Sequence, residues 1–243
     1  MTAIAPPNVL ASVDLGSNSF RLQVCENING QLKIIDSFKQ MVRFAAGLDE
    51  HKNLDQASQE RALNCLEKFG ERLRKFPPEQ VRVVATNTFR VAKNINEFIP
   101  KAEAALGFPI EVIAGREEAR LIYTGVVHTL PPNGDKMLVI DIGGGSTECI
   151  IGRGMQPLER ESLQAGCIAS TRRFFPSGRL SKKKWKDALT EITAEFQQFA
   201  STYRSLGWDE AVGSSGTNKA IGEICAALKL TKGAVTVEAL PQV

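Results

Sequence analysis

Two short segments of this chain place an aspartate, small residues and a serine in the same order. Asp14–Ser19 is DLGSNS and Asp141–Ser146 is DIGGGS, and the two begin 127 residues apart. Glycine lets a backbone approach a ligand closely, and successive N–H groups in such a turn form a nest for anions. One copy alone is usually an ordinary turn. Two copies, each between apolar runs, predict a pair of loops that clamp a phosphate chain.

The aspartates of these segments indicate a divalent cation. Asp14 and Asp141 stand at the ends of apolar runs, where each carboxylate would meet a cation that bridges the bound phosphates. Mg²⁺ typically takes one or two carboxylates, with substrate oxygens and waters completing its shell. A third small-residue turn, Gly213–Thr217, adds Gly213, Ser214 and Gly216 as phosphate or ribose contacts, unless it serves only as a helix N-cap.

Three charged segments have both a structural and a functional interpretation. Arg90 follows the strand-like run VRVVAT and is either a solvated arginine or a bidentate phosphate ligand. Glu117 and Glu118 either complement the dipole of a helix that starts at Gly115, or one of them activates water. The residues alone do not choose between the two glutamates. Lys182–Lys184 forms a solvated face at a helix start, or else meets an anionic polymer.

The elements that position these residues repeat along the chain. Apolar runs predict strands over 9–14, 19–26, 31–38, 81–86 and 109–114, and helical spacing predicts helices over 62–76, 94–106 and 115–127. The loop signal Pro131–Gly134 marks a domain boundary, after which the pattern restarts. The second half has strands over 137–142, 147–152, 157–163 and 210–213, a helix capped by Ser181 and ended by Gly207, and a last helix through 228. We therefore expect two similar α/β domains, 1–130 and 131–243, with mixed sheets.

Composition excludes several classes of protein. The 243 residues include 43% hydrophobic side chains, and the formal net charge is +3. This charge is too small to indicate nucleic acid, although it suits an anionic small molecule. No apolar run is long enough to span a membrane, and no secretory signal is recognised. Five scattered cysteines and two histidines exclude a disulfide scaffold and a zinc module, and they favour a reducing, cytoplasmic location.

The motifs resemble those of the exopolyphosphatase/guanosine pentaphosphate phosphohydrolase (Ppx/GppA) family, in the family's order from about Val9 to Leu228. The segments that carry the resemblance are VDLGSNSF (13–20), VATNTFR (84–90), GREEARLIY (115–123), VIDIGGGSTE (139–148) and GSSGT (213–217). The family belongs to the actin-like ATPase superfamily. The resemblance therefore implies two ribonuclease-H-like domains around a central cleft.

The resemblance also implies roles for individual residues. Glu118 is the expected catalytic base, Arg90 binds the phosphate that is removed, and Asp141 binds Mg²⁺ with Glu148 as a second ligand. The residues expected to hold the phosphate chain are Asp14, Gly16, Ser17, Asn18, Ser19, Gly143, Gly144, Gly145 and Ser146. Family members also have a further strand and helix at the end of the second domain, which residues 235–243 do not supply. We therefore expect the second domain to be incomplete at its C-terminal end.

The leading functional hypothesis is hydrolysis of the terminal phosphate of inorganic polyphosphate. Hydrolysis of guanosine pentaphosphate by the same residues is the close alternative, and Gly145, where phosphohydrolase-type members often have Ala, favours polyphosphate. A sugar kinase would need an acceptor pocket with an aspartate base, which is not found. A module that binds polyphosphate or nucleotide without catalysis is a further alternative. The family is compatible with a homodimer, and no specific nucleic acid or membrane partner is expected.

Overall fold

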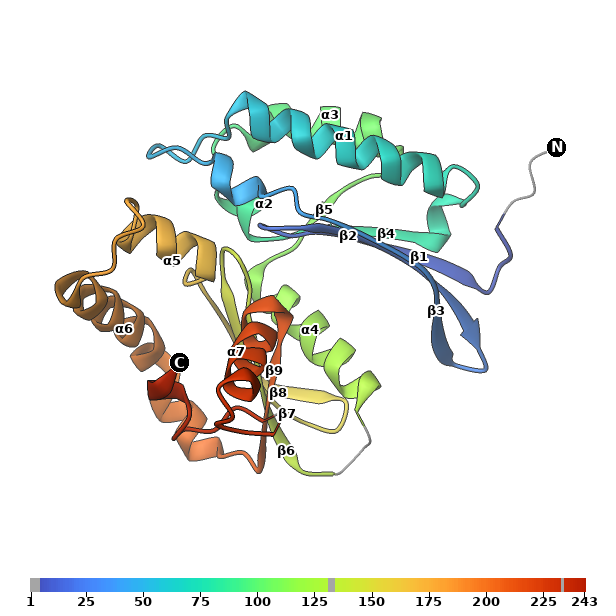
Figure 1. The fold of residues 1–243 in the computed structure, drawn as a ribbon. Helices are drawn as coiled ribbons and strands as arrows, with labels where there is room; N and C mark the ends of the chain where they lie inside the picture. The colour runs from blue at the N-terminus through green and yellow to red at the C-terminus, as the bar shows by residue number, and fades with distance from the viewer. Residues whose placement is uncertain (1–4, 131–133, 233) are drawn as a thin grey trace. The chain divides into compact units, whose positions relative to one another are not determined.

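The computed structural model describes residues 5–130, 134–232 and 234–243, which form two compact units, Met1–Ala114 and Gly115–Val243. Each unit has one mixed sheet with helices packed on it (Figure 1). The first contains β1 (Val9–Leu15), β2 (Phe20–Ile28), β3 (Gln31–Gln40), η1 (Phe44–Gly47), α1 (Gln56–Leu73), η2 (Pro78–Gln80), β4 (Val81–Ala85), α2 (Asn87–Val91), α3 (Ile95–Leu106) and β5 (Glu111–Val112). The second contains α4 (Gly115–Thr129), β6 (Lys136–Ile142), β7 (Thr147–Arg153), β8 (Gln156–Leu163), α5 (Cys167–Phe174), α6 (Lys182–Leu206), β9 (Glu210–Ser214), α7 (Ser215–Ala227) and η3 (Leu240–Gln242).

The first unit is organised around a five-stranded sheet with the order β3-β2-β1-β4-β5. Strands β1, β2 and β3 pair antiparallel, whereas β4 lies parallel to β1 and β5 lies parallel to β4. Helix α1 begins at the N-cap Asp55, whose side chain accepts a hydrogen bond from Ser58 N. It buries one face, which contains Ala62, Leu66, Phe69 and Leu73 at helical spacing. Helix α3 ends at Gly107, which adopts the left-handed conformation at φ 82° that favours glycine.

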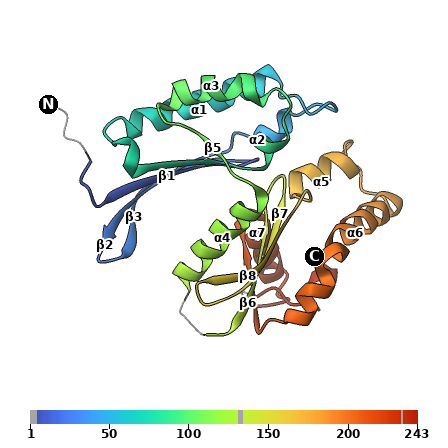
Figure 2. The same ribbon diagram turned by 180° about the vertical axis from the view of Figure 1, so that it is seen from behind.

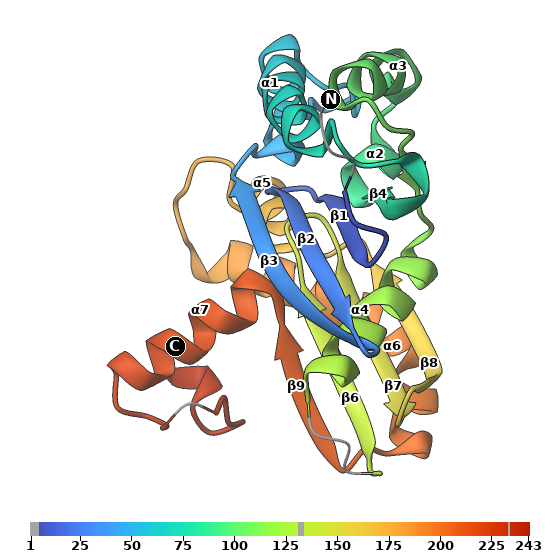
Figure 3. The ribbon, with the colours of Figure 1, turned by 90° about the vertical axis from the view of Figure 1, so that its right-hand side faces the viewer.

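The second sheet has four strands among the described residues, in the order β8-β7-β6-β9 (Figure 3). Helix α4 packs on one face, where Tyr123 contacts a cluster with Met137 and Val139. Helix α6 packs on the other face, where Tyr203 joins Leu138 and Cys149 (Figure 2). Because helices cover both faces, β7 is buried at six of its seven positions instead of alternating.

The division of the chain differs from the sequence expectation in one respect. The second unit starts at Gly115, because α4 packs against β6, β7 and β8 of the second sheet. The predicted boundary is the loop near residue 131, which assigns this helix to the first domain. Pro131–Asn133 lies outside the described residues. Periodicity predicts the helix and its apolar stripe, but it carries no signal of which sheet the stripe covers.

Candidate active site

The first glycine loop connects β1 to β2, as predicted, and main-chain bonds hold it from one side. The carbonyl of Ser17 accepts from Ala45 N at 2.8 Å, and the carbonyl of Asn18 accepts from Arg43 N at 2.8 Å. In a trans peptide the next residue's N–H points opposite to the carbonyl. The N–H groups of Asn18 and Ser19 therefore point away from the segment that holds the loop.

The segment that carries Arg90 lies beside this loop. Arg90 belongs to the last turn of α2, a short helix that the sequence analysis did not predict. Thr88, buried in the same helix, donates from Oγ1 to Ser17 Oγ at 2.8 Å. The guanidinium of Arg90 donates from Nη1 to the carbonyl of Ile113 at 3.0 Å. The first unit thus brings together the residues predicted from the first loop and from the VATNTFR motif.

The second glycine loop connects β6 to β7 and is held in the same way. The carbonyls of Gly143, Gly144 and Gly145 accept from the N–H groups of Cys167, Ile168 and Gly166 at 2.9, 2.9 and 3.2 Å. These three donors lie at the start of α5. The N–H groups of Gly144, Gly145 and Ser146 consequently point away from α5, as an anion nest requires.

Gly166 is a residue of this site that the sequence analysis missed. A Cβ atom at this position would lie 2.4 Å from the Gly144 carbonyl carbon and from Gly145 N. Only glycine therefore allows α5 to approach the loop so closely. A glycine directly before a helix was the available signal, although nothing in the sequence relates it to a loop some 20 residues earlier.

Carboxylates gather at the end of the second sheet. Asp141 and Glu148 are directly opposite each other in the antiparallel pairing of β6 with β7. Glu148 is almost fully buried and accepts a hydrogen bond from Ser162 Oγ at 2.7 Å. Burial, followed by the charge of Glu118 and with a smaller contribution from Asp141, raises the pKa of Glu148 to about 8. Burial also raises the pKa of Asp141, although hydrogen bonds from Ser214 and Ser215 oppose the shift.

The third predicted turn completes this group. Ser214 lies at the end of β9, which runs parallel to β6, and its hydroxyl donates to Asp141 Oδ2. Ser215 is a non-glycine residue at φ 71°, a conformation that costs about 1–3 kcal/mol and is concentrated at functional sites. Asn218 fixes the turn by donating to the carbonyls of Ile140 and Ser214 at 3.0 and 2.8 Å. Gly213 and Gly216 flank this strained position.

The structure distinguishes the two adjacent glutamates of α4. Glu117 forms a bidentate ion pair with Arg120 of the same helix, at 2.7 and 2.8 Å. Glu118 instead interacts electrostatically with Glu148, so its carboxylate belongs to the acidic group of the second unit. Ala119 and Tyr123, the buried residues of α4, form the apolar face of this helix.

The residues fit a divalent cation in their chemistry. Within the described ranges, no group of three or more His, Cys, Asp or Glu residues is arranged to enclose a metal. Mg²⁺, however, usually keeps several waters and takes only one or two protein carboxylates. Burial and the nearby charge of Glu118, with a smaller contribution from the opposed Asp141, make the ionised form of Glu148 costly, as its raised pKa shows. A cation between Asp141 and Glu148 would offset this cost.

Comparison with known proteins identifies the family. The sequence model of the Ppx/GppA phosphatase family matches residues 23–243. The chain belongs to the Ppx/GppA phosphatase family. The fold accordingly is the actin-like, ribonuclease-H-like α/β class that the resemblance implied. No helix of the described part is both long and apolar enough to cross a bilayer.

Individual Ppx/GppA relatives differ in their names and lengths. A Haemophilus influenzae protein named for exopolyphosphatase activity is 43% identical over 95% of this chain and 71% of its own length. A Vibrio vulnificus guanosine-5'-triphosphate,3'-diphosphate pyrophosphatase is 44% identical over 88% of this chain. The chain spans only 43% of that protein. The solved Aquifex aeolicus Ppx/GppA enzyme is 28% identical with a TM-score of 0.73, over 92% of this chain and 73% of its own.

Proposed function

We propose that this chain hydrolyses the terminal phosphoanhydride bond of inorganic polyphosphate, with Mg²⁺ as cofactor. The observation that carries the proposal is the pair of glycine loops, which are held by equivalent main-chain bonds that turn their N–H groups away from the holding segments. Two such nests suit a substrate with several phosphates in a row. Exopolyphosphatase names among the relatives support the same conclusion.

The proposed roles follow from the chemistry of the residues. The N–H groups of both loops would hold the phosphate chain, and Arg90 would bind the phosphate that leaves. Glu118 would orient a water molecule and accept its proton during in-line attack. Mg²⁺, held by Asp141 and Glu148 with substrate oxygens, would neutralise charge on the transferred group. Catalysis would consist mostly of positioning and electrostatic stabilisation.

Guanosine pentaphosphate is the second candidate substrate, because a specific observation favours it. The Vibrio relatives, at 43–44% identity, are named as pyrophosphatases of that nucleotide. Its 5'-triphosphate end would offer the same bond to the same residues. The two substrates therefore share the site, and they differ only in what lies beyond the terminal phosphates.

Phosphate release assays test the proposal. We expect the chain to release phosphate from polyphosphate faster than from guanosine pentaphosphate, and only when Mg²⁺ is present. An EDTA-treated sample and the Glu118→Gln variant are the controls. Faster release from the nucleotide would reverse the order of the two candidates, and binding without release from either would indicate a non-catalytic module.

A further inference from the structure

The most basic part of the chain lies outside the residues that the proposed reaction uses. Residues 172–186 contain seven Lys or Arg and no Asp or Glu, whereas the whole chain has 30 basic and 27 acidic residues. The rest of the chain therefore has 23 basic and 27 acidic residues, a formal charge of −4. We call the seven cations the α5–α6 basic surface, and they are Arg172, Arg173, Arg179, Lys182, Lys183, Lys184 and Lys186.

The cations of this surface are exposed and mostly not neutralised. Six of the seven are exposed and Lys184 is half-buried. Arg173 pairs with Glu191 across α5 and α6. Among the described residues, no carboxylate forms an ion pair with Arg179 or with any of the four lysines.

A purely structural role does not account for this arrangement. Three of the lysines occupy the first turn of α6, after the N-cap Ser181. Positive charges are unfavourable at that end of a helix, where acidic residues are preferred. Lys182 and Lys186 are also four residues apart, a spacing at which like charges repel. These costs would be offset by a bound anion.

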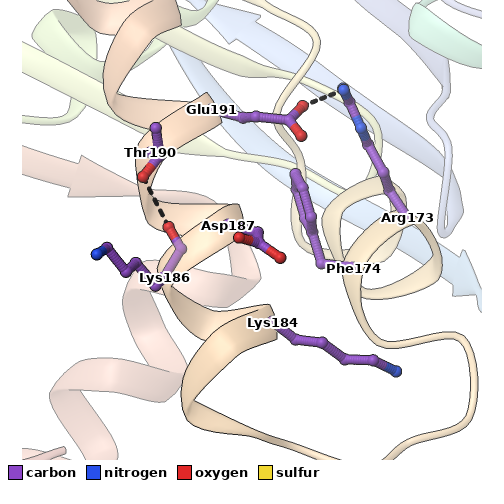
Figure 4. Close-up of a pocket in the computed structure, with 7 residues that line it drawn as sticks. All are labelled: Arg173, Phe174, Lys184, Lys186, Asp187, Thr190 and Glu191. Carbon is purple, nitrogen blue, oxygen red and sulfur yellow. Dashed lines mark hydrogen bonds and ion pairs between the residues drawn. The ribbon is translucent and has the colours of Figure 1, made fainter.

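The surface is built on an ordered framework. Phe175 contacts Phe174 edge-to-face and Trp185 at a tilt, with ring centroids 6.5 and 6.4 Å apart, and so joins the end of α5 to the start of α6. A cavity of about 500 Å³ opens beside the Phe174 ring, and its lining includes the carboxylates Asp187 and Glu191 as well as cations of the surface. In Figure 4 the Arg173–Glu191 pair lies beside the Phe174 ring, while Lys184 and Lys186 extend away from each other. The cations therefore form an open, extended surface, which suits a linear polyanion better than a compact ligand.

Helix α5 connects this surface to the second glycine loop. Its first residues hold the carbonyls of Gly143 and Gly144, and its last turn carries Arg172 and Arg173. At ~1.5 Å per residue, the eight residues of α5 span ~12 Å. Charges farther apart than the Debye length of ~8 Å at physiological salt are largely screened from each other. The four lysines follow the end of α5, so they have little influence on phosphates at the loop and act on a chain long enough to reach them.

We propose that the α5–α6 basic surface binds the distal part of a long polyphosphate chain whose end occupies the second glycine loop. This inference rests on the proposed function for the identity of the polymer. Two contacts on one chain raise the overall affinity through effective concentration. The surface would thus raise the affinity for long polyphosphate above that for guanosine pentaphosphate, because only the longer chain reaches it.

Direct binding measurements test this proposal independently of catalysis. The Lys182→Gln/Lys183→Gln/Lys184→Gln variant removes three cations, and the control Lys33→Gln/Lys68→Gln/Lys101→Gln removes three exposed lysines from the first unit. Binding of fluorescently labelled long-chain polyphosphate is followed by anisotropy in EDTA, where hydrolysis does not proceed. We expect the first variant to bind ~10-fold or more weakly and the control to bind within ~2-fold of the unsubstituted chain. The slope of log affinity against log salt should become shallower by about 2, since each phosphate contact on a flexible strand contributes ~0.7.

Three outcomes would overturn the proposal. The first is unchanged binding of long polyphosphate by the lysine variant. The second is an equal loss for tripolyphosphate, which would place the lysines in the loop site itself. The third is equally tight, lysine-dependent binding of a single-stranded RNA, which would make the surface a nucleic-acid site. Binding is measured in EDTA and does not depend on hydrolysis. If the chain hydrolyses neither substrate, the proposed function is contradicted, but the binding test of the α5–α6 basic surface still gives a clear result.

Discussion

The two glycine loops are held by the same bonds but face different charges. Asn18 O accepts from Arg43 N and Gly145 O accepts from Gly166 N, so the acceptors are 127 residues apart and the donors 123. The same offsets relate the bond between Ser17 O and Ala45 N to the bond between Gly144 O and Ile168 N. The repeat therefore extends beyond the loop sequence to the main chain that supports each loop.

The two hairpins differ in the residue that lies opposite the motif aspartate. In the register of the first hairpin Asp14 is opposite Arg21, whereas in the second Asp141 is opposite Glu148. Opposite residues on one face of a sheet have Cβ atoms about 4.5–5.5 Å apart. The first hairpin thus places opposite charges at these paired positions, and the second places like charges there. This difference at equivalent positions is the basis for our proposal that Mg²⁺ binds at the second loop.

The supports of the two loops also differ. The first is held by the short turn η1, whose N-cap Arg43 is a non-glycine residue at φ 53°. The second is held by the start of α5 through a contact that only Gly166 permits. The first support therefore stores backbone strain, and the second depends on close packing.

The largest expected effect tests whether the acidic group of the second unit is catalytic. Glu118→Gln should lower turnover by about 10²–10⁴, as removal of a general base does. Glu117→Gln should change turnover little, because Glu117 is held in a half-exposed ion pair with Arg120. Phosphate release measures both variants, with the melting temperature as control for folding. If Glu117→Gln loses turnover instead, the assignment of the base to Glu118 is wrong.

The next effect concerns pH and tests the cost of burying the Glu148 carboxylate. The pKa of Glu148 is about 8 in the folded chain, against an ordinary glutamate pKa near 4.3 in the unfolded chain. The folded state thus holds a proton that the unfolded state loses, so stability without metal falls as pH rises between these values. The free energy of unfolding should fall by a few kcal/mol over this pH range in the unsubstituted chain, and this fall should be absent in Glu148→Gln.

Urea unfolding in EDTA at pH 5 and pH 8.5 measures this fall. The unsubstituted chain should lose stability between the two pH values, while Glu148→Gln should change much less. Addition of Mg²⁺ at pH 8.5 should stabilise the unsubstituted chain and not the variant. Equal pH dependence in both proteins would show that the buried carboxylate is not the source of the cost.

A smaller effect tests the proposed phosphate contact of Arg90 in the first unit, where the glycine loop has no acidic pair. Arg90→Ala should weaken substrate binding by about 1.5–3 kcal/mol, the value of a charge-assisted hydrogen bond. Steady-state kinetics should show this change mainly in the Michaelis constant. Mg²⁺ binding should not change. An unchanged Michaelis constant and turnover in Arg90→Ala would show that Arg90 is not part of the site.

The smallest effect tests the support of the second loop. Gly166→Ala places a methyl group against the backbone of Gly144, and such overpacking typically costs about 1–3 kcal/mol. Gly125→Ala is the matched control, since a Cβ atom at that position of α4 meets nothing within 4 Å. Thermal unfolding should show a loss for the first variant, and for the control no loss or a gain of up to about 1 kcal/mol.

Most of the strands and helices could be predicted from the sequence, because apolar periodicity indicates them and turn residues mark their ends. The strands, the helices α1, α3, α4, α6 and α7, and the repeat are confirmed. Helices α2 and α5 were not predicted, since α2 has five residues and α5 has no buried residue to produce a period. The bonds that hold the loops join main-chain atoms and therefore leave no side-chain pattern. The distinction between Glu117 and Glu118 likewise depends on packing, because both occupy the first turn of one helix.

Mg²⁺ binding by the Asp14→Asn and Asp141→Asn variants tests the proposal that Asp141, at the second loop, holds the cation, and whether Asp14 contributes to it. Isothermal titration calorimetry with MgCl₂ measures the affinity of each variant and of the unsubstituted chain, with circular dichroism as the control for folding. We expect Asp141→Asn to lose Mg²⁺ binding and Asp14→Asn to retain it. Loss in Asp14→Asn alone, or unchanged binding in both variants, would show that the cation is not held at the second loop.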